Sequence, residues 1–360
     1  MKEFLSSRWN RREALHLMSA GVAGLMTGCG ADSSPVSTGT TESSSASDGN
    51  TEDIEPPIIR TLLGDISPNA IDGVTLFHEH LSIKLSESMT ATDDIDMIVN
   101  EIQTASTEGL GCIVDGGHTD MRRDLNACRR VAEETDVHVV ASGGYYMERF
   151  YPPGLAEKSD DEIADDLVEE AVRDRLGAFG EVGQTSNVAT MTPLERKVFQ
   201  AVGKAHVRSG IPIFTHNAYG TGEHVTAEQG LVQLDVLESV GVNPRTVAIG
   251  HACCLDDPSA RVLQEIAARG AFVGFDRVTG GRVDDDQKVR TILSFLEGGY
   301  AEQLLISSDY IGRRSPERPG YGNAITVFAP LMRAAGVDEE TMTAIFYDNP
   351  RMFLAYVPRI

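Results

Sequence analysis

The stretch Val74-Thr75-Leu76-Phe77-His78-Glu79-His80 places three ionisable residues directly after a short apolar run. The run is rich in residues that favour strands, so it predicts a buried β-strand that leads into the first histidine. Side chains two residues apart point to the same side of an extended strand, and His78 and His80 can therefore bind one cation together. Glu79 points the other way and is expected to support the site from behind.

Apolar runs of this kind recur along the chain and alternate with longer segments of helical periodicity. Such alternation predicts repeated βα units and a parallel sheet. Eight runs are candidate strands: 74–77, 111–115, 138–142, 178–182, 211–215, 246–250, 271–275 and 303–307. Amphipathic helices are expected between them, for example over 161–176, 193–209, 229–240 and 260–269. Eight βα units in about 300 residues predict a (β/α)8 TIM barrel, with a doubly wound sheet as the alternative.

The polar residues at the ends of these runs favour the barrel, because its reactive groups project from the C-terminal ends of the strands. Four imidazoles and two carboxylates occupy such positions: His78, His80, Glu181, His216, His251 and Asp309. Any one of these histidines alone could be a hydrogen-bonded polar residue at the edge of the core. Six ionisable residues at equivalent places in five βα units predict a metal site at the C-terminal end of the barrel instead.

This ligand set suits zinc, and also manganese, iron or cobalt. Six protein ligands are too many for one catalytic zinc ion, so we expect two divalent metal ions that share a carboxylate. Two such ions can hold a hydroxide between them, lower the pKa of its parent water and polarise the bond under attack. The pattern therefore predicts a metal-dependent hydrolase. His118 and His224, in loops on the same face, are candidates for contact with the substrate.

The N-terminal segment is not expected to belong to the barrel, which we place at 58–360. Arg11 and Arg12 precede a weakly apolar run that is too short to span a membrane, which predicts a twin-arginine-type signal peptide over 1–28. The run ends in a sequence that resembles a lipobox, so Cys29 is expected to be lipidated, with an ordinary cleavage site as the alternative. Ser/Thr-rich sequence predicts a tether over 29–57. We expect export and a lipid anchor at the outer face of the cell membrane.

The composition is acidic, with 54 Asp and Glu against 31 Lys and Arg and a net charge of -23. An acidic surface repels phosphate backbones, and no basic patch with interleaved aromatic residues occurs in the sequence, so no nucleic-acid partner is expected. The only expected membrane contact is the lipid on Cys29. Four further cysteines lack the spacing of a structural zinc site and are expected to be buried thiols, although an exported protein could pair some of them: Cys112, Cys128, Cys253 and Cys254.

The nine residues Gly73-Val74-Thr75-Leu76-Phe77-His78-Glu79-His80-Leu81 are similar to the first signature of the phosphotriesterase family, a branch of the amidohydrolases. The resemblance covers roughly residues 58–357 and extends through Thr215-His216, Ile249-Gly250-His251, Gly274-Phe275-Asp276-Arg277, Ser308-Asp309 and Asn349-Pro350-Arg351-Met352-Phe353-Leu354. It implies that His78, His80 and Asp309 bind the buried metal ion, and that His216 and His251 bind the exposed one.

The chain departs from one part of the family pattern. Phosphotriesterases and many lactonases bridge the two ions with a carboxylated lysine, whereas this chain has Gly180-Glu181-Val182-Gly183 at that place. Glutamate there marks the subgroup of phosphotriesterase-related proteins, so the resemblance implies that Glu181 is the bridge, with a buried structural carboxylate as the alternative. We therefore expect lactones, other carboxylic esters or N-acyl amides as substrates, rather than organophosphates.

The resemblance also implies catalytic roles. Asp309 would carry a proton from the attacking hydroxide to the leaving group. Tyr146 and Arg277 match positions where lactonase relatives place a tyrosine near the bridging solvent and a substrate-facing arginine; for Arg277 a salt bridge is the alternative, because Asp276 is its neighbour. Relatives are often homodimers. A true phosphotriesterase and a non-catalytic, surface-displayed barrel are the alternative functions.

Overall fold

The computed structural model describes residues 55–86, 89–91, 94–185, 189–217, 225–312 and 320–360. The predicted signal peptide (1–28), the lipidation site Cys29 and most of the tether (29–57) lie outside the described residues, as does His224. The expectations for these segments therefore stay predictions. Among the described residues, no helix combines the length and the apolar character that crossing a membrane requires.

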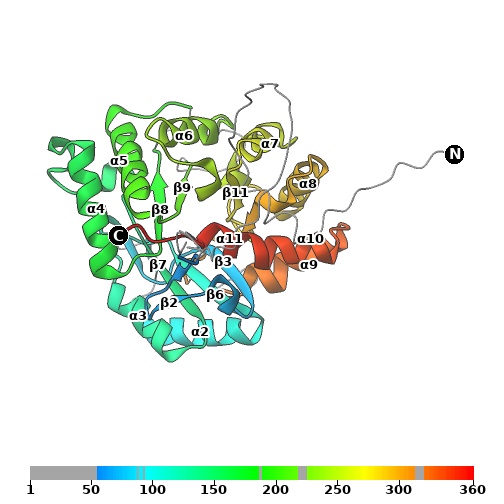
Figure 1. Cartoon of the computed structure of the whole chain (residues 1–360). Helices are drawn as coiled ribbons and strands as arrows, with labels where there is room; N and C mark the ends of the chain where they lie inside the picture. Colours follow the sequence, from blue (N-terminus) through cyan, green and yellow to red (C-terminus); the bar gives the residue numbers. More distant parts are fainter. Residues whose placement is uncertain (1–54, 87–88, 92–93, 186–188, 218–224, 313–319) are drawn as a thin grey trace, which may run out of the picture. The chain divides into compact units, whose positions relative to one another are not determined.

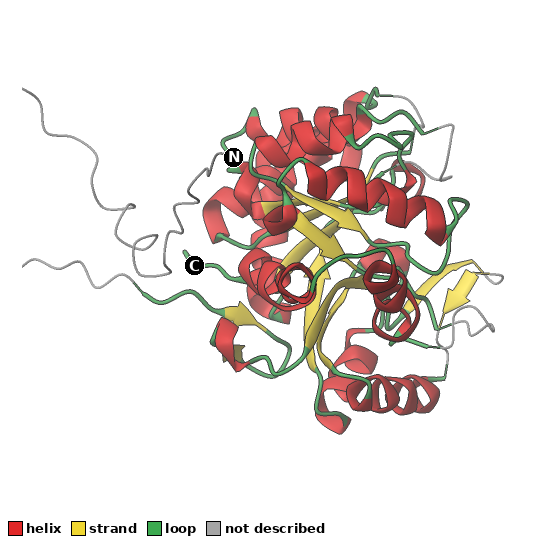
Figure 2. Cartoon of the chain, turned by 90° about the vertical axis from the view of Figure 1, so that its right-hand side faces the viewer, coloured by secondary structure: helices red, strands yellow, loops and turns green. Residues whose placement is uncertain are grey.

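The centre of the fold is a sheet of eight parallel strands with helices packed around it (Figure 1, Figure 2). In spatial order the strands are β3 (Val74–Glu79), β6 (Leu110–Asp115), β7 (His138–Gly143), β8 (Ala178–Gly183), β9 (Ile213–His216), β10 (Val247–Ile249), β11 (Phe272–Phe275) and β12 (Leu304–Ile306). The ends of each strand lie within two residues of a predicted run. Spatial order follows chain order throughout, which a doubly wound sheet does not do. The predicted (β/α)8 barrel is confirmed.

Hydrogen bonds between the first strand and the segment after the last one close the barrel. His78 N donates to Ser307 Oγ (3.0 Å), Asp309 N donates to His78 O (3.2 Å), and His80 N donates to Tyr310 O (3.0 Å). The residues on the two sides of this seam are far apart in the chain; His78 and Ser307, for example, are separated by 229 positions. Barrel closure therefore brings predicted site residues from the first and last βα units side by side.

Outer helices follow most of the strands. They are α2 (Ile95–Thr107), α3 (Leu125–Glu134), α4 (Asp160–Asp174), α5 (Pro193–Ser209), α6 (Gln229–Glu238), α7 (Arg261–Ala268) and α8 (Asp285–Glu297), followed by the shorter α9 (Ala329–Ala334), α10 (Glu339–Thr343) and α11 (Asn349–Leu354). Of these, α2, α3, α4, α5 and α8 begin at a residue whose side chain caps the helix. At the start of α5, Thr192 Oγ1 accepts from Glu195 N (3.1 Å), while the Glu195 carboxylate accepts from Thr192 N (3.0 Å). This reciprocal capping box satisfies two backbone donors.

The C-terminal helix seals the end of the barrel opposite the predicted site. Phe353 and Leu354 of α11 pack against inward-facing residues of the strands, among them Phe77 and Phe272, whose rings lie 6.2 and 5.5 Å from that of Phe353. Two hairpins lie outside the barrel sheet, β1 (Ile59–Arg60) with β2 (Asp65–Ile66) and β4 (Ile83–Ser86) with β5 (Met89–Ala91). The interior is thus a packed core, and access is left to the C-terminal ends of the strands.

The four cysteines of the barrel are all buried and unpaired, as predicted: Cys112, Cys128, Cys253 and Cys254. The Sγ atoms of Cys253 and Cys254 lie 3.7 Å apart, which is far longer than a disulfide bond. The possibility of disulfides among these four residues is therefore not borne out in this structure.

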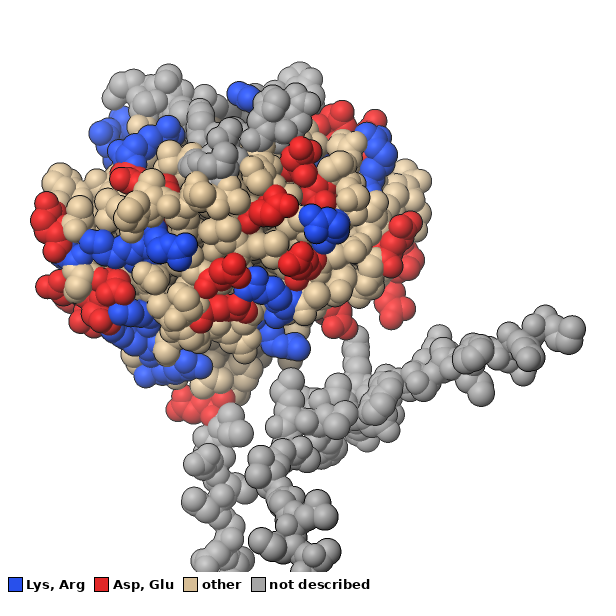
Figure 3. All heavy atoms as spheres, turned by 90° about the horizontal axis from the view of Figure 1, so that it is seen from above, with Lys and Arg blue, Asp and Glu red and all other residues tan. Residues whose placement is uncertain are grey.

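Charges of both signs are interspersed on the face seen in Figure 3. Several charged residues form ion pairs between helices: Lys204 Nζ of α5 lies 2.9 Å from Asp161 of α4, and Arg208, also of α5, lies 2.6 Å from that carboxylate. Exposed pairs of this kind contribute little to stability. On the face in Figure 3, the cations lie among carboxylates rather than forming one basic patch.

The loop between β11 and α8 is fastened by Lys288. Its buried ammonium donates to Gly280 O (2.6 Å) and to Asp285 Oδ1 (2.9 Å), and the same carboxylate oxygen accepts from Thr279 N (2.9 Å). These bonds hold the base of the loop against α8.

Replacing this lysine by methionine is expected to lower the free energy of unfolding by about 2 kcal/mol, because Gly280 O and Asp285 lose a charged donor. Urea titration measures the change. The control is Lys158→Met, which removes an exposed ion pair with Asp166 and should change the free energy of unfolding much less. An equal decrease in the free energy of unfolding in Lys288→Met and in the control would contradict the role of Lys288 in holding the loop.

Candidate metal centre

The structure brings the six predicted side chains together at the C-terminal ends of the strands. Their potential ligand atoms form two groups in which all atoms lie within 4.8 Å of one another, and a third such group joins His78 and His251 to Asp276. The first contains His78, His80, Glu181 and Asp309, and the second contains Glu181, His216 and His251. Glu181 is the member that both groups share. This is the arrangement expected of a carboxylate between two cations.

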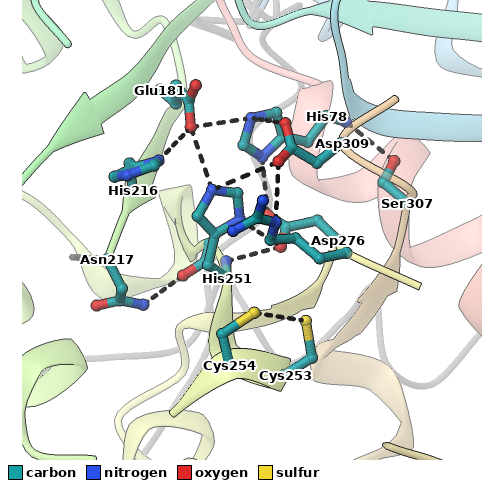
Figure 4. Close-up of polar contacts among 12 residues, drawn as sticks. His78, Glu181, His216, Asn217, His251, Cys253, Cys254, Asp276, Ser307 and Asp309 are labelled. Carbon is teal, nitrogen blue, oxygen red and sulfur yellow. Dashed lines mark hydrogen bonds and ion pairs between the residues drawn. The ribbon is translucent and has the colours of Figure 1, made fainter. Parts of the chain in front are cut away.

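Glu181 lies near the end of β8, and Figure 4 shows dashed lines from its carboxylate to His78, His216 and His251. Its Oε2 atom is 2.6 Å from His216 Nδ1, 3.2 Å from His78 Nε2 and 3.4 Å from His251 Nε2. Its Oε1 atom is 3.2 Å from His80 Nε2. One carboxylate therefore faces all four imidazoles. A purely structural carboxylate would need only one or two of these partners.

Asp309 follows β12 and completes the first group. Its Oδ1 atom is 3.1 Å from His80 Nε2, and its Oδ2 atom is 3.1 Å from Arg277 Nε. The backbone around it is held by Glu79, which accepts from Ser308 N (2.7 Å) and Tyr310 N (2.6 Å). Glu79 thus supports the site from behind, as its opposite orientation on the strand predicted.

Two of the site residues adopt left-handed backbone conformations, His251 with φ 51° and Asp309 with φ 47°. For residues other than glycine this conformation costs on the order of 1 kcal/mol. Hydrogen bonds offset the cost: His251 N donates to Asp276 Oδ1 (2.7 Å), and Asp309 N donates to His78 O (3.2 Å). The main chain is therefore bent at both places so that the two side chains face the cluster.

Asp276, directly after β11, is the functional residue that the sequence interpretation missed. It was considered only as an ion-pair partner for Arg277, whereas the structure places Arg277 against Asp309. The two oxygens of Asp276 instead accept from the far side of two imidazoles, at 2.8 Å from His78 Nδ1 and 2.9 Å from His251 Nδ1. These bonds fix the tautomer and turn the Nε2 atoms toward Glu181. The position of Asp276 directly after a strand is the feature of the sequence that could have identified this residue.

Two buried nitrogen atoms without a hydrogen-bond partner are suited to bind a metal ion. Nε2 of His78 and Nε2 of His251 are fully buried, and neither forms a hydrogen bond. Because each ring already donates from Nδ1 to Asp276, each Nε2 is the nitrogen that would offer a lone pair to a cation in place of a proton. Buried nitrogen lone pairs beside carboxylate oxygens are the donor set of zinc, manganese, iron and cobalt.

The electrostatics of the cluster favour added positive charge. Burial opposes protonation of His80, but hydrogen bonds to Asp309 and Glu181 outweigh it and raise its pKa to about 9. Burial is likewise outweighed at His251, whose pKa is raised to about 10 by Asp276 and Glu181. At His216 burial prevails over the charge of Glu181 and lowers the pKa to about 4, so the carboxylates favour the protonated form at His80 and His251 but not at every imidazole. Divalent cations would take the place of those protons.

Substitution of Asp276 by asparagine is expected to weaken metal binding by about 10- to 100-fold without removing a ligand, because the two imidazoles lose the group that orients them. Metal titration of the demetallated protein measures the change. The control is Asp115→Asn, since Asp115 is equally buried but its Oδ1 accepts from Leu81 N (2.8 Å) rather than from an imidazole. Unchanged affinity in Asp276→Asn, or an equal loss in both variants, would refute the assigned role.

Tyr146 and Arg277 both lie beside the cluster but belong to neither ligand group. The ring of Tyr146 is buried and meets that of His216 edge to face, with 4.8 Å between centroids. Burial, together with the charges of Glu181 and Asp309, raises the pKa of Tyr146 well above its usual value, so its phenol stays protonated. Arg277 Nε lies 3.1 Å from Asp309 Oδ2, which is the kind of contact given as the alternative for this residue. The catalytic roles that the resemblance implies for both residues stay predictions.

His118, one of two loop histidines considered for substrate contact, is fully buried in the structure. Its Nδ1 atom lies 3.1 Å from Asp120 Oδ1, and Asp120 Oδ2 accepts from Tyr146 N (2.8 Å). The contacts of His118 therefore support the loop that carries Tyr146. They do not place it among the candidate ligands.

Comparison with known proteins agrees with this geometry. The profile of the phosphotriesterase family matches residues 57–354. The phosphotriesterase homology protein of Escherichia coli (strain K12) is 31% identical over 294 residues, which cover 78% of this chain and 97% of that protein. A crystal structure of the E. coli phosphotriesterase homology protein, complexed with phosphate in its active site, matches with a TM-score of 0.71 and 28% identity, covering 79% of this chain and 99% of that one.

Two further relatives have names that state an activity. The aryldialkylphosphatase of Saccharolobus solfataricus is 29% identical over 308 residues, covering 79% of this chain and 95% of that protein. The N-acetyltaurine hydrolase of Rattus norvegicus is 22% identical over 352 residues, covering 83% of this chain and 98% of that protein. With a family profile that spans most of the barrel and a relative above 30% identity, the chain belongs to the phosphotriesterase family.

Proposed function

We propose that this protein is a hydrolase that binds two divalent metal ions and cleaves lactones, carboxylic esters or N-acyl amides. The observation that carries the proposal is the position of Glu181, whose carboxylate belongs to both groups of candidate ligands. Zinc is the proposed metal, with manganese, iron or cobalt as alternatives that suit the same donors. Membership of a hydrolase family and relatives named as a phosphatase and an amide hydrolase support the reaction class.

The proposed ligands divide between the two ions. His78, His80 and Asp309 would hold one ion, His216 and His251 the other, and Glu181 would bridge them. When bound, such ions lower the pKa of water and polarise the bond under attack. The same cluster would therefore supply both the nucleophile and the stabilisation of charge on the reacting oxygen.

Asp309 is the proposed proton carrier. Although burial alone would raise the pKa of Asp309, its hydrogen bond to His80 and the charge of Arg277 hold the pKa below its usual range. The ionised carboxylate can accept a proton from the attacking water and deliver it to the leaving group. Tyr146, with a protonated phenol close to His216, would donate a hydrogen bond to the substrate, and Arg277 would orient it.

The substrate class follows from the bridging position and from the relatives. The chain has a glutamate where the family's phosphotriesterases carry a carboxylated lysine, which favours carbonyl substrates. The N-acetyltaurine hydrolase acts on an amide, which also favours a carbonyl substrate. Because the chain is also similar to an aryldialkylphosphatase, phosphotriesters are the second candidate substrate class. A non-catalytic barrel would be expected to lack a ligand, whereas all six candidate side chains meet here.

A substrate panel on the zinc-loaded protein tests the proposal. We expect turnover of at least one class among γ- and δ-lactones, acyl-homoserine lactones and N-acyl amino acids, with paraoxon cleaved more slowly or not at all. Chelation should remove the activity, and zinc should restore it. Activity confined to paraoxon would establish the phosphotriesterase alternative. Inactivity toward every carbonyl substrate would overturn the proposed class.

We also propose that the protein is exported and anchored to the outer face of the cell membrane through a lipid on Cys29. The supporting observations are the paired Arg11 and Arg12 before the apolar run and the lipobox-like sequence that ends at Cys29. In cell fractionation, Cys29→Ala should move the protein from the membrane to the soluble exported fraction. Replacing both arginines by lysine should leave it inside the cell. Membrane association that survives Cys29→Ala would contradict the anchor.

A further inference from the structure

The histidines of the metal centre are not all oriented in the same way. The rings of His78 and His251 are held by Asp276, which faces the Nδ1 atom of each. His80 has no such support: its Nδ1 atom is buried and forms no hydrogen bond with any described residue. The position of the His80 ring therefore depends on the main chain that carries it.

Both main-chain polar groups of His80 form hydrogen bonds with tyrosine residues that follow the last barrel strand. His80 N donates to the carbonyl oxygen of Tyr310 (3.0 Å), the residue directly after the proposed ligand Asp309. The hydroxyl of Tyr321 donates to His80 O (2.7 Å). This second bond is buried and joins residues 241 positions apart in the chain. The two bonds hold the peptide groups on either side of the His80 side chain.

Tyr321 is itself firmly placed. Its side chain is fully buried, and its ring meets the ring of Tyr310 edge to face, with 4.8 Å between centroids. Tyr310 N donates to the carboxylate of Glu79 (2.6 Å), the residue before His80. A ring packed in this way has little room to turn, so the hydroxyl of Tyr321 stays directed at His80 O.

A small movement of this main chain would be felt at the metal centre. The Nε2 atom of His80 lies 3.1 Å from Asp309 Oδ1 and 3.2 Å from Glu181 Oε1, the carboxylates proposed to hold the same ion. A buried carbonyl that loses its donor is destabilised, and the chain that carries it shifts toward other partners. Loss of the Tyr321 hydroxyl would therefore displace the imidazole from these two oxygens.

We propose that Tyr321 is a positioning residue for the metal ligand His80. Its hydroxyl fixes the carbonyl of His80, so that the imidazole presents Nε2 to the ion shared with His78 and Asp309. This inference rests on the proposed function and extends its metal centre to a residue that is not a ligand. It assigns the effect of Tyr321 to one of the two proposed ions, the one that His80 binds.

The substitution Tyr321→Phe tests the inference, because it removes the hydroxyl and keeps the ring. Calorimetric titration of the demetallated protein with zinc should show about tenfold weaker binding of the ion at His80, within the range for groups that orient metal ligands. The affinity for the second ion should stay unchanged. The visible absorption spectrum of the cobalt-loaded protein should also change, because it depends on the geometry of the ligands. A purely structural role would lower the unfolding temperature but would not move this spectrum.

A double-mutant cycle assigns the effect to His80. In a His80→Ala background, Tyr321→Phe should cause no further loss of affinity for the ion that remains. In a His216→Ala background, which keeps His80, the tenfold loss should persist. A loss of the same size in the His80→Ala background would contradict the assignment.

The matched control is Tyr356→Phe. Tyr356 is also buried, but its hydroxyl forms no hydrogen bond with any described residue. This control should leave both the zinc affinities and the cobalt spectrum as in the wild type. Zinc affinity and a cobalt spectrum unchanged in Tyr321→Phe would overturn the inference, even if that variant unfolds at a lower temperature.

Failure of the proposed metal centre gives a different result. If the wild type binds neither zinc nor cobalt, the metal centre is refuted, and the positioning role of Tyr321 with it. If the wild type binds both ions and Tyr321→Phe matches it, only the role of Tyr321 is refuted.

Discussion

Replacing Glu181 by alanine is expected to leave the purified protein with fewer bound metal ions than the two per chain expected for the wild type, and to lower kcat/KM by at least about 1000-fold. Both groups of candidate ligands contain this carboxylate, so its loss affects both proposed ions. Metal ions contribute several kcal/mol to the stabilisation of charge in the transition state, and each 1.36 kcal/mol is a factor of ten in rate. Elemental analysis together with steady-state kinetics measures both effects.

Two further variants separate the charge of Glu181 from its burial. Glu181→Gln keeps the size of the side chain but loses the negative charge that four imidazoles face, so it should lose metal almost as fully as the alanine variant. Glu195→Ala removes another fully buried glutamate, one that caps α5 by accepting from Thr185 N (2.7 Å) and Thr192 N (3.0 Å). It should be less stable but keep its metal. Full metal content in Glu181→Ala would refute the bridge.

The fold was predictable because its determinants are local. Each barrel strand is a short run of apolar and β-branched residues, and several of these runs are followed by a helical segment with its own cap, as at Thr192 before α5. The predicted ligands could be found for the same reason: in a barrel, the residue that follows a strand faces the open end wherever that strand stands in the ring. His78, His216 and His251 all satisfy this rule.

The features of the site that the sequence did not predict depend on contacts between segments far apart in the chain. Asp276 also follows a strand, but its role exists only because the closed barrel places it 2.8 Å from the ring of His78, 198 residues away. The ion pair between Arg277 and Asp309 likewise joins β11 to the end of β12. Sequence thus predicted which residues face the open end, but not which of them touch.

Substitution of Asp309 by asparagine is expected to lower kcat by roughly 100- to 10,000-fold, the range for loss of a positioned proton carrier. Asparagine keeps an oxygen that can face His80, so the variant should retain more metal than Glu181→Ala does. The matched control is Asp257→Asn. Asp257 is also buried, but its carboxylate accepts from Val262 N (2.7 Å) and Leu263 N (3.0 Å) at the start of α7.

The leaving group distinguishes a proton carrier from a simple ligand. A p-nitrophenyl ester departs as a stable anion and needs no proton, whereas an alkyl ester or an amide must be protonated as the bond breaks. If Asp309 carries the proton, Asp309→Asn should lose far more activity toward alkyl esters and amides than toward the p-nitrophenyl ester. If Asp309 only holds metal, the loss should be the same for every substrate, and excess zinc should reverse it. If the loss of activity is equal for all substrates and excess zinc reverses it, Asp309 acts only as a metal ligand.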